Sequence, residues 1–173
     1  MKQPTPPIEW VDDHIRIIDQ TLLPSELKII EIRTAAQAVD AIQRLAIRGA
    51  PALGAFGSLA LVVALDEYHS KSLNEAISHL ESCRVSIGDA RPTAVNLRWA
   101  VDRVIDRAIA RSSDLENLRD NLLREAHLVA AEDAEACAEI GRLGRELLRD
   151  AVVIGTHCNA GRLATAGLSL IHI

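Results

Sequence analysis

The 173-residue sequence carries 24 acidic and 19 basic side chains, so its formal net charge is −5. A surface that binds nucleic acid needs clustered lysine and arginine, which this balance argues against. Aromatic residues make up only 2% of the sequence, so a core must be built from Ala, Leu, Ile and Val, which favours packed helices. The longest apolar run, residues 59–65, is too short to span a bilayer, and residues 1–7 lack the apolar core of a signal peptide. We therefore expect a cytoplasmic protein with neither nucleic acid nor membrane among its partners.

Three short segments near the start alternate between apolar and polar residues. The patterns at residues 8–11, 14–18 and 27–32 predict strands, and the residues between them are typical of turns. A small antiparallel sheet is the simplest arrangement of these three segments.

From Thr34 the apolar spacing becomes helical, and Thr34 is a suitable cap for the first helix. Pro51 suits the first turn of a second helix that runs towards residue 65. Gly54 and Gly57 in that helix allow neighbouring helices to approach closely. Ser72 begins a capping box for a third helix.

Two further helices are predicted before residue 148. Thr93 is a candidate cap for the fourth helix, and Ser113 opens the longest helical pattern. Within that last pattern, Gly141 or Gly144 suggests a break.

The final segment has a different character. Residues 151–154 form an apolar run that predicts a buried parallel strand, and residues 155–161 form a polar turn that leads into a helical pattern at 163–166. This is the opening of a βα unit, and ligands of open α/β sheets bind in the loop beyond a strand's carboxyl end. The sheet needs more strands than the remaining residues supply.

Cys158 lies in that turn and is the leading candidate for chemistry. A helix amino terminus or a cationic neighbour lowers the pKa of a thiol and makes it reactive. The alternative is a small buried thiol that acts as an apolar side chain. Cys83 and Cys137 lie in helical patterns without convergent polar motifs, so we interpret them as structural. No C-x-x-C spacing and no dinucleotide or nucleotide-hydrolase fingerprint is visible, so we expect no metal and no cofactor.

Two arginines precede predicted helices. Arg48 and Gly49 lie before the proline-started helix, where an arginine and backbone N–H groups can face a phosphate. An Arg-Gly pair that ends the preceding helix explains the same residues equally well. Pro92 restricts Arg91 to an extended conformation, but spacing alone favours a simple loop-to-helix junction there.

Four segments occur in an order that resembles one family. They lie at residues 19–24, 46–54, 91–97 and 155–161, and the most specific are Ala-Ile-Arg-Gly-Ala-Pro at 46–51 and Thr-His-Cys-Asn-Ala-Gly at 156–161. Together they resemble methylthioribose-1-phosphate isomerase, within a wider group that includes initiation factor 2B regulatory subunits and ribose-1,5-bisphosphate isomerase.

The resemblance implies an activity and a set of site residues. The family converts methylthioribose 1-phosphate to methylthioribulose 1-phosphate in methionine salvage, by aldose–ketose isomerisation of a small sugar phosphate. Arg48, Gly49 and Ala50 match one substrate-binding segment, and Arg91 matches another substrate contact. Cys158 matches the catalytic cysteine, which stabilises the transition state. Family members commonly form homodimers at full length.

The resemblance also implies a domain organisation. Residues 1–148 are expected to form an α+β domain of a small antiparallel sheet with a helical bundle. Residues 149–173 are expected to begin a Rossmann-like α/β domain that is truncated. The family's catalytic aspartate and an Asn-Lys pair belong downstream of the cysteine, and the tail from Leu168 to Ile173 departs from the family pattern. We therefore expect a fragment that is inactive alone.

Three alternatives remain open. The first is ribose-1,5-bisphosphate isomerase, which two-substrate assays distinguish. The second is a non-catalytic regulatory subunit related to initiation factor 2B. The third is a stand-alone helical module that binds a partner through an unfinished α/β edge.

Overall fold

The computed structural model describes residues 5–167 and 169, and it begins with a three-stranded sheet. Strands β1 (Ile8–Val11), β2 (His14–Ile18) and β3 (Ile29–Ile32) pair antiparallel in the order β1-β2-β3. This confirms the predicted small antiparallel sheet, although β3 begins two residues later than its pattern indicated.

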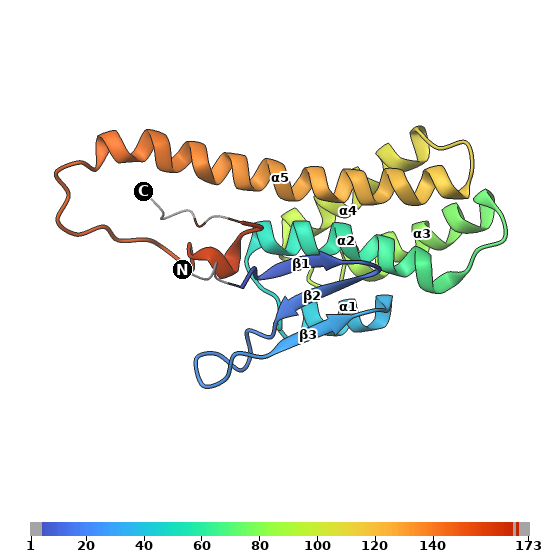
Figure 1. The fold of residues 1–173 in the computed structure, drawn as a ribbon, viewed down its shortest axis with the longest axis horizontal. Coiled ribbons are helices and arrows are strands. Elements are labelled where there is room, and N and C mark those ends of the chain that lie inside the picture. The colour runs from blue at the N-terminus through green and yellow to red at the C-terminus, as the bar shows by residue number, and fades with distance from the viewer. Residues whose placement is uncertain (1–4, 168, 170–173) are drawn as a thin grey trace.

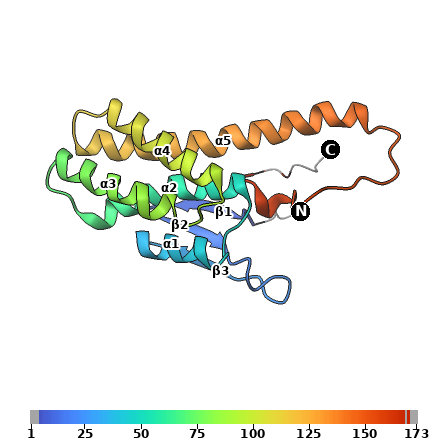
Figure 2. The ribbon, with the colours of Figure 1, turned by 180° about the vertical axis from the view of Figure 1, so that it is seen from behind.

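Five helices follow the sheet, as the apolar spacing predicted. The helices are α1 (Ala35–Gln43), α2 (Ala50–Tyr68), α3 (Leu73–Gly88), α4 (Val95–Ala110) and α5 (Leu115–Leu147). In Figure 1 the sheet and α1 lie on one side of α2, and α5 runs along the opposite side. Figure 2 shows from behind that α3 and α4 complete the bundle around α2.

Helix α2 forms the centre of the core. It is long and apolar enough to cross a bilayer, but 78% of its most apolar stretch is buried inside the protein, so it is a core helix. Phe56 is fully buried there. A Cβ at Gly57 would lie 2.4 Å from the Leu97 Cδ1 atom of α4, so the absence of a side chain at Gly57 lets α2 and α4 pack closely there.

The structure confirms two predicted helix caps and corrects two others. The Ser72 hydroxyl accepts a hydrogen bond from Glu75 N at 3.3 Å at the start of α3, as predicted. The Thr34 hydroxyl accepts a hydrogen bond from Gln37 N at 3.1 Å, as predicted. Helix α4 is preceded by Ala94 rather than capped by Thr93, and α5 is capped by the Asp114 carboxylate, one residue beyond Ser113. A carboxylate is the stronger acceptor for the free N–H groups of a helix, which favours Asp114.

The expected break in α5 is absent, because the helix continues through both glycines to Leu147. Glycine weakens a helix by only about 1 kcal/mol relative to alanine, and flanking helix-forming residues offset that cost.

The prediction of a strand at 151–154 is wrong for this structure. These residues adopt no regular structure, and the side chains of Val152 and Val153 are 97% and 86% exposed. A parallel strand needs neighbours for its backbone groups and apolar faces, and no described segment supplies them. The helix expected at 163–166 is reduced to one 3-10 turn, η1 (Arg162–Ala164). Except for Ser169, the departing tail 168–173 lies outside the described residues.

Candidate functional site

The segment before α2 places three of the predicted binding residues at a helix start. Arg48 is exposed, Gly49 is the N-cap residue, and Ala50 begins the helix. Within residues 5–167 and 169, no side chain caps this end of α2. The positive end of a helix and its free N–H groups favour an anion, and Arg48 adds a full positive charge beside them.

The chain returns to this helix start more than a hundred residues later. After the loop that follows α5, η1 packs against the beginning of α2 (Figure 1). A Cβ at Gly49 would lie 2.4 Å from the Ala164 Cα atom, and Gly49 has φ of +102°, which L side chains rarely adopt. The segment that carries Cys158 is therefore anchored at the Arg48–Ala50 segment through Ala164.

We predict that Gly49→Ala destabilises the protein. The added methyl group would overlap backbone atoms of Ala164, and the positive φ adds strain of about 1–3 kcal/mol. Urea unfolding should show a loss of at least that size. Gly155→Ala is the matched control, because no atom of the described residues lies within 4 Å of its Cβ position. Equal stability of the two variants would contradict the packing described for Gly49.

Gln20 links the same two segments, and sequence reasoning assigned it no role. Its side chain is 3% exposed, its Nε2 donates to the Leu163 carbonyl at 2.9 Å, and its Oε1 accepts from Arg48 Nε at 3.4 Å. Its backbone N–H donates to the Ala46 carbonyl at 3.0 Å. Gln20 is thus a positioning residue for Arg48. The only hint of this role in the sequence was that Gln20 lies in the 19–24 segment, which is one of the four segments that carry the family resemblance.

The neighbouring Asp19 holds the loop that contains Gln20. Its carboxylate accepts from the Thr21 hydroxyl at 2.6 Å and from Arg44 Nη1 at 2.8 Å, and its side chain is almost buried. Burial alone would raise the pKa of Asp19, but the hydrogen bonds from Thr21 and Arg44 lower it below its ordinary value. Asp19 therefore stays charged at neutral pH and keeps the loop in place.

Arg91 enters from the loop before α4. Its carbonyl accepts a hydrogen bond from Ala94 N at 2.9 Å, which closes the turn that leads into α4. The first turns of α2 and α4 adjoin, because a Cβ at Gly54 would lie 3.2 Å from the Asn96 carbonyl oxygen. The Arg48–Ala50 and Arg91 segments thus precede helices whose first turns are neighbours.

Cys158 is not brought into a pocket. The residue is exposed, its φ is +69°, and the Thr156 hydroxyl donates to its backbone carbonyl at 3.5 Å. Among the described residues, no hydrogen bond joins its thiol to Arg48, Arg91 or His157. The expected pocket depended on the strand at 151–154, which does not form.

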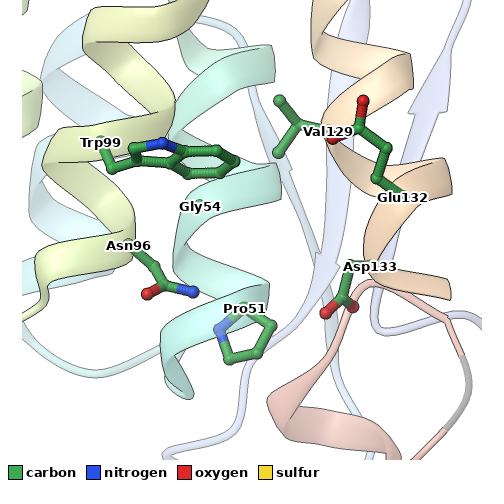
Figure 3. A pocket seen from close by; sticks show the side chains of 7 residues that line it. All are labelled: Pro51, Gly54, Asn96, Trp99, Val129, Glu132 and Asp133. Carbon is green, nitrogen blue, oxygen red and sulfur yellow. The ribbon is translucent and has the colours of Figure 1, made fainter. Parts of the chain in front are cut away.

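A cavity of about 220 Å³ lies between α2, α4 and α5 (Figure 3). It adjoins the segments described above, because one lining residue, Pro51, directly follows Ala50, and another, Asp133, accepts a hydrogen bond from Ala166 N at 2.8 Å. The residues that line it are Pro51, Gly54, Asn96, Trp99, Val129, Glu132 and Asp133.

These features define a fold that matches a known class of proteins. Residues 46–171 match the model of the Initiation factor 2 subunit family, and the chain belongs to this family.

Relatives within the family include isomerases. The chain is 42% identical over 167 residues to 5-deoxyribose 1-phosphate isomerase of Moorella thermoacetica. This alignment covers 96% of the chain and 48% of that protein. It is 40% identical over 164 residues to methylthioribose-1-phosphate isomerase of Thermosynechococcus vestitus, with 93% and 46% covered. The chain thus spans about half the length of the curated relatives it matches. The resemblance to methylthioribose-1-phosphate isomerase is confirmed.

Two solved structures share the fold. The 5-methylthioribose 1-phosphate isomerase of Pyrococcus horikoshii OT3 superimposes with a TM-score of 0.85 at 32% identity, covering 95% of this chain and 47% of that one. A structure from A. fulgidus described as translation initiation factor eIF-2B subunit delta gives a TM-score of 0.85 at 40% identity, with 95% and 48% covered.

Proposed function

We propose that this chain provides the sugar-phosphate-binding part of an S-methyl-5-thioribose-1-phosphate isomerase, which forms methylthioribulose 1-phosphate in methionine salvage. The observation that carries this proposal is the packing of η1 (Arg162–Ala164) onto Gly49 at the start of α2. It places the residues that directly follow the 155–161 segment against the 46–54 segment, and both of these segments carry the family resemblance. Relatives named as isomerases at about 40% identity support it.

In this proposal each predicted site residue has a chemical role. Arg48 and the backbone of Gly49 and Ala50 bind the phosphate group at the positive end of α2, and Arg91 makes a second contact with the substrate. Cys158 stabilises the transition state. The sugar ring must open before C1 and C2 exchange oxidation states, so the reaction also requires a general acid or base and a site that excludes water.

The exposed position of Cys158 sets a requirement for this mechanism. Further residues must cover the thiol during catalysis, and the relatives are about twice as long as this chain. Three further predictions belong to the same proposal. The chain divides into domains between residues 148 and 149, the full-length protein forms a homodimer, and the protein is cytoplasmic.

A non-catalytic regulatory role is the second candidate. It is favoured by the likeness to the A. fulgidus structure named as an initiation factor subunit. Such a protein would act through protein contacts and would convert no sugar phosphate.

Turnover distinguishes the two candidates. The protein as its gene encodes it is incubated with methylthioribose 1-phosphate, and the appearance of the ketose carbonyl is followed by carbon NMR. If the proposal is correct, the aldose is converted to the ketose until the two sugar phosphates reach equilibrium. A folded protein that leaves the aldose unchanged would favour the regulatory role.

A further inference from the structure

The segment that follows η1 is bound to α5 as well as to the start of α2. Ala166 N donates a hydrogen bond to Asp133 Oδ2 at 2.8 Å. A Cβ at Gly167 would lie 3.2 Å from the Ala134 Cβ atom, so this part of the chain also packs on α5. Figure 3 shows Asp133 pointing from α5 towards it. The η1 turn is therefore held between two helices, α2 on one side and α5 on the other.

The carboxylate of Asp133 is available for this contact, whereas that of its neighbour is not. Both oxygens of Glu132 are bound by Arg103, with Nη2 at 2.7 Å from Oε1. Among the described residues, no cation forms an ion pair with Asp133. Its partly buried carboxylate thus binds the backbone N–H of Ala166 without competition, and a hydrogen bond to a charged acceptor is stronger than one between neutral groups.

Asp133 supplies the third of three contacts that fix the orientation of η1. Gln20 Nε2 donates to the Leu163 carbonyl at 2.9 Å, and Ala164 packs against Gly49. These two contacts are adjacent, so alone they would let η1 rotate about the line that joins them. The contact on α5 lies further along the chain and removes that freedom.

Short-range hydrogen bonds connect the fixed end of the segment to Cys158. Gly161 N donates to Asn159 Oδ1 at 3.0 Å, which closes a turn directly after Cys158. Ala164 N donates to the Gly161 carbonyl at 3.0 Å and forms η1. Ala166 follows η1 almost immediately. A displacement of Ala166 is therefore passed on to Cys158 through this series of local turns.

We propose that Asp133 is a positioning residue, which through Ala166 N fixes η1, and thereby Cys158, relative to the start of α2. This inference rests on the proposed function and adds to it a residue that acts through the backbone rather than on the substrate. A displacement of about 1 Å at a reacting group can lower a rate about 100-fold. Binding of the phosphate does not need this contact, because Arg48 lies on the other side of η1, before α2.

The test compares Asp133→Ala with Asp133→Asn in turnover of methylthioribose 1-phosphate, using the protein as its gene encodes it. Asp133→Ala should lower kcat per folded molecule about tenfold or more and change KM less than about threefold. Asp133→Asn should restore kcat to within about threefold of the wild type, because its amide oxygen still accepts from Ala166 N. Glu135→Ala, at an exposed position of α5, is the matched control and should change neither constant.

Two kinetic results would overturn the proposal. Wild-type kcat in Asp133→Ala would show that the contact with Ala166 does not position Cys158. An Asp133→Asn variant as slow as Asp133→Ala would show that the charge of the carboxylate, rather than its hydrogen bond to the backbone, is what the reaction needs. Either result would leave the isomerase function intact.

Amide hydrogen exchange tests the contact independently of turnover. In Asp133→Ala the amide of Ala166 should exchange about tenfold or more faster than in the wild type, whereas the amides of α3 should keep their rates. Asp133→Asn should exchange like the wild type at Ala166. A wild type without turnover would end the proposed function, whereas unchanged exchange at Ala166 in Asp133→Ala would overturn the role of Asp133 alone.

Discussion

Cys158→Ser is expected to lower kcat for methylthioribose 1-phosphate by about 100-fold or more, with a much smaller change in KM. Loss of one group that stabilises charge in a transition state typically costs this much, whereas substrate binding depends on Arg48 and the start of α2. Steady-state kinetics on the protein as its gene encodes it provide the measurement. A variant that keeps kcat within a factor of three of the wild type would remove Cys158 from the mechanism.

The other cysteines supply the control for this experiment. Cys83 is 3% exposed, and its burial, together with the nearby Glu67, raises its pKa to about 11. Cys137 is equally buried, whereas Cys158 is exposed. Iodoacetamide should therefore alkylate Cys158 first in the folded protein and abolish turnover, and methylthioribose 1-phosphate should slow that reaction. Cys83→Ala should leave kcat per folded molecule unchanged.

Glu125→Ala should lower the free energy of unfolding by about 1–3 kcal/mol, because Arg103 loses one buried partner while it keeps Glu132, and Arg107 and Arg111 are half-exposed. Glu125 lies on α5 and is 1% exposed. Its Oε1 accepts from Arg103 Nε at 2.8 Å and Arg107 Nη1 at 2.7 Å, and Arg111 Nη1 lies 3.5 Å from its Oε2. This carboxylate thus joins Arg103 and Arg107 of α4, and Arg111 at its C-cap, to α5. Urea unfolding followed by circular dichroism measures the loss.

Glu139→Ala on the same helix is the matched control. Glu139 pairs with Arg142 at the surface, and an exposed pair of this kind contributes at most about 1 kcal/mol. Similar small losses in both variants would contradict the structural role of Glu125.

The contribution of Glu125 should also depend on pH. Burial alone would raise its pKa above the ordinary value of 4.5, but hydrogen bonds from Arg103 and Arg107 lower it overall. A carboxyl group with a lowered pKa in the folded state stabilises the protein fully above its unfolded-state pKa, and this stabilisation is lost as pH falls through the folded-state value. The stability difference between wild type and Glu125→Ala should therefore be constant near pH 7 and shrink below about pH 4.5.

Local patterns predicted most of the fold because local forces determine it. The alternation at residues 8–18 and the 3.6-residue spacing after Thr34 specify which faces are buried, and the structure confirms the sheet and all five helices. The exact helix starts were less predictable. Thr93 and Asp114 compete with neighbouring residues for the cap position, and a shift of one residue costs little energy.

The last segment shows where such reasoning fails. The apolar run at 151–154 has the composition of a buried strand, but strand formation depends on neighbours that no local pattern can specify. The same limit hid the roles of Gln20 and Glu125, whose partners lie far away in the sequence or on another helix. The sequence did place Arg48 and Gly49 at a helix start, because proline and glycine mark that boundary directly.

The start of α2 is the proposed site that binds sugar phosphate, and the isomerase function requires it. Isothermal titration of the protein as its gene encodes it with methylthioribose 1-phosphate tests this directly, comparing wild type with Arg48→Ala and with Arg142→Ala, a surface arginine of α5. A charged hydrogen bond is worth about 1.5–3 kcal/mol, so the Kd should be at least about tenfold weaker for Arg48→Ala and unchanged for Arg142→Ala. An unchanged Kd in Arg48→Ala would contradict this assignment.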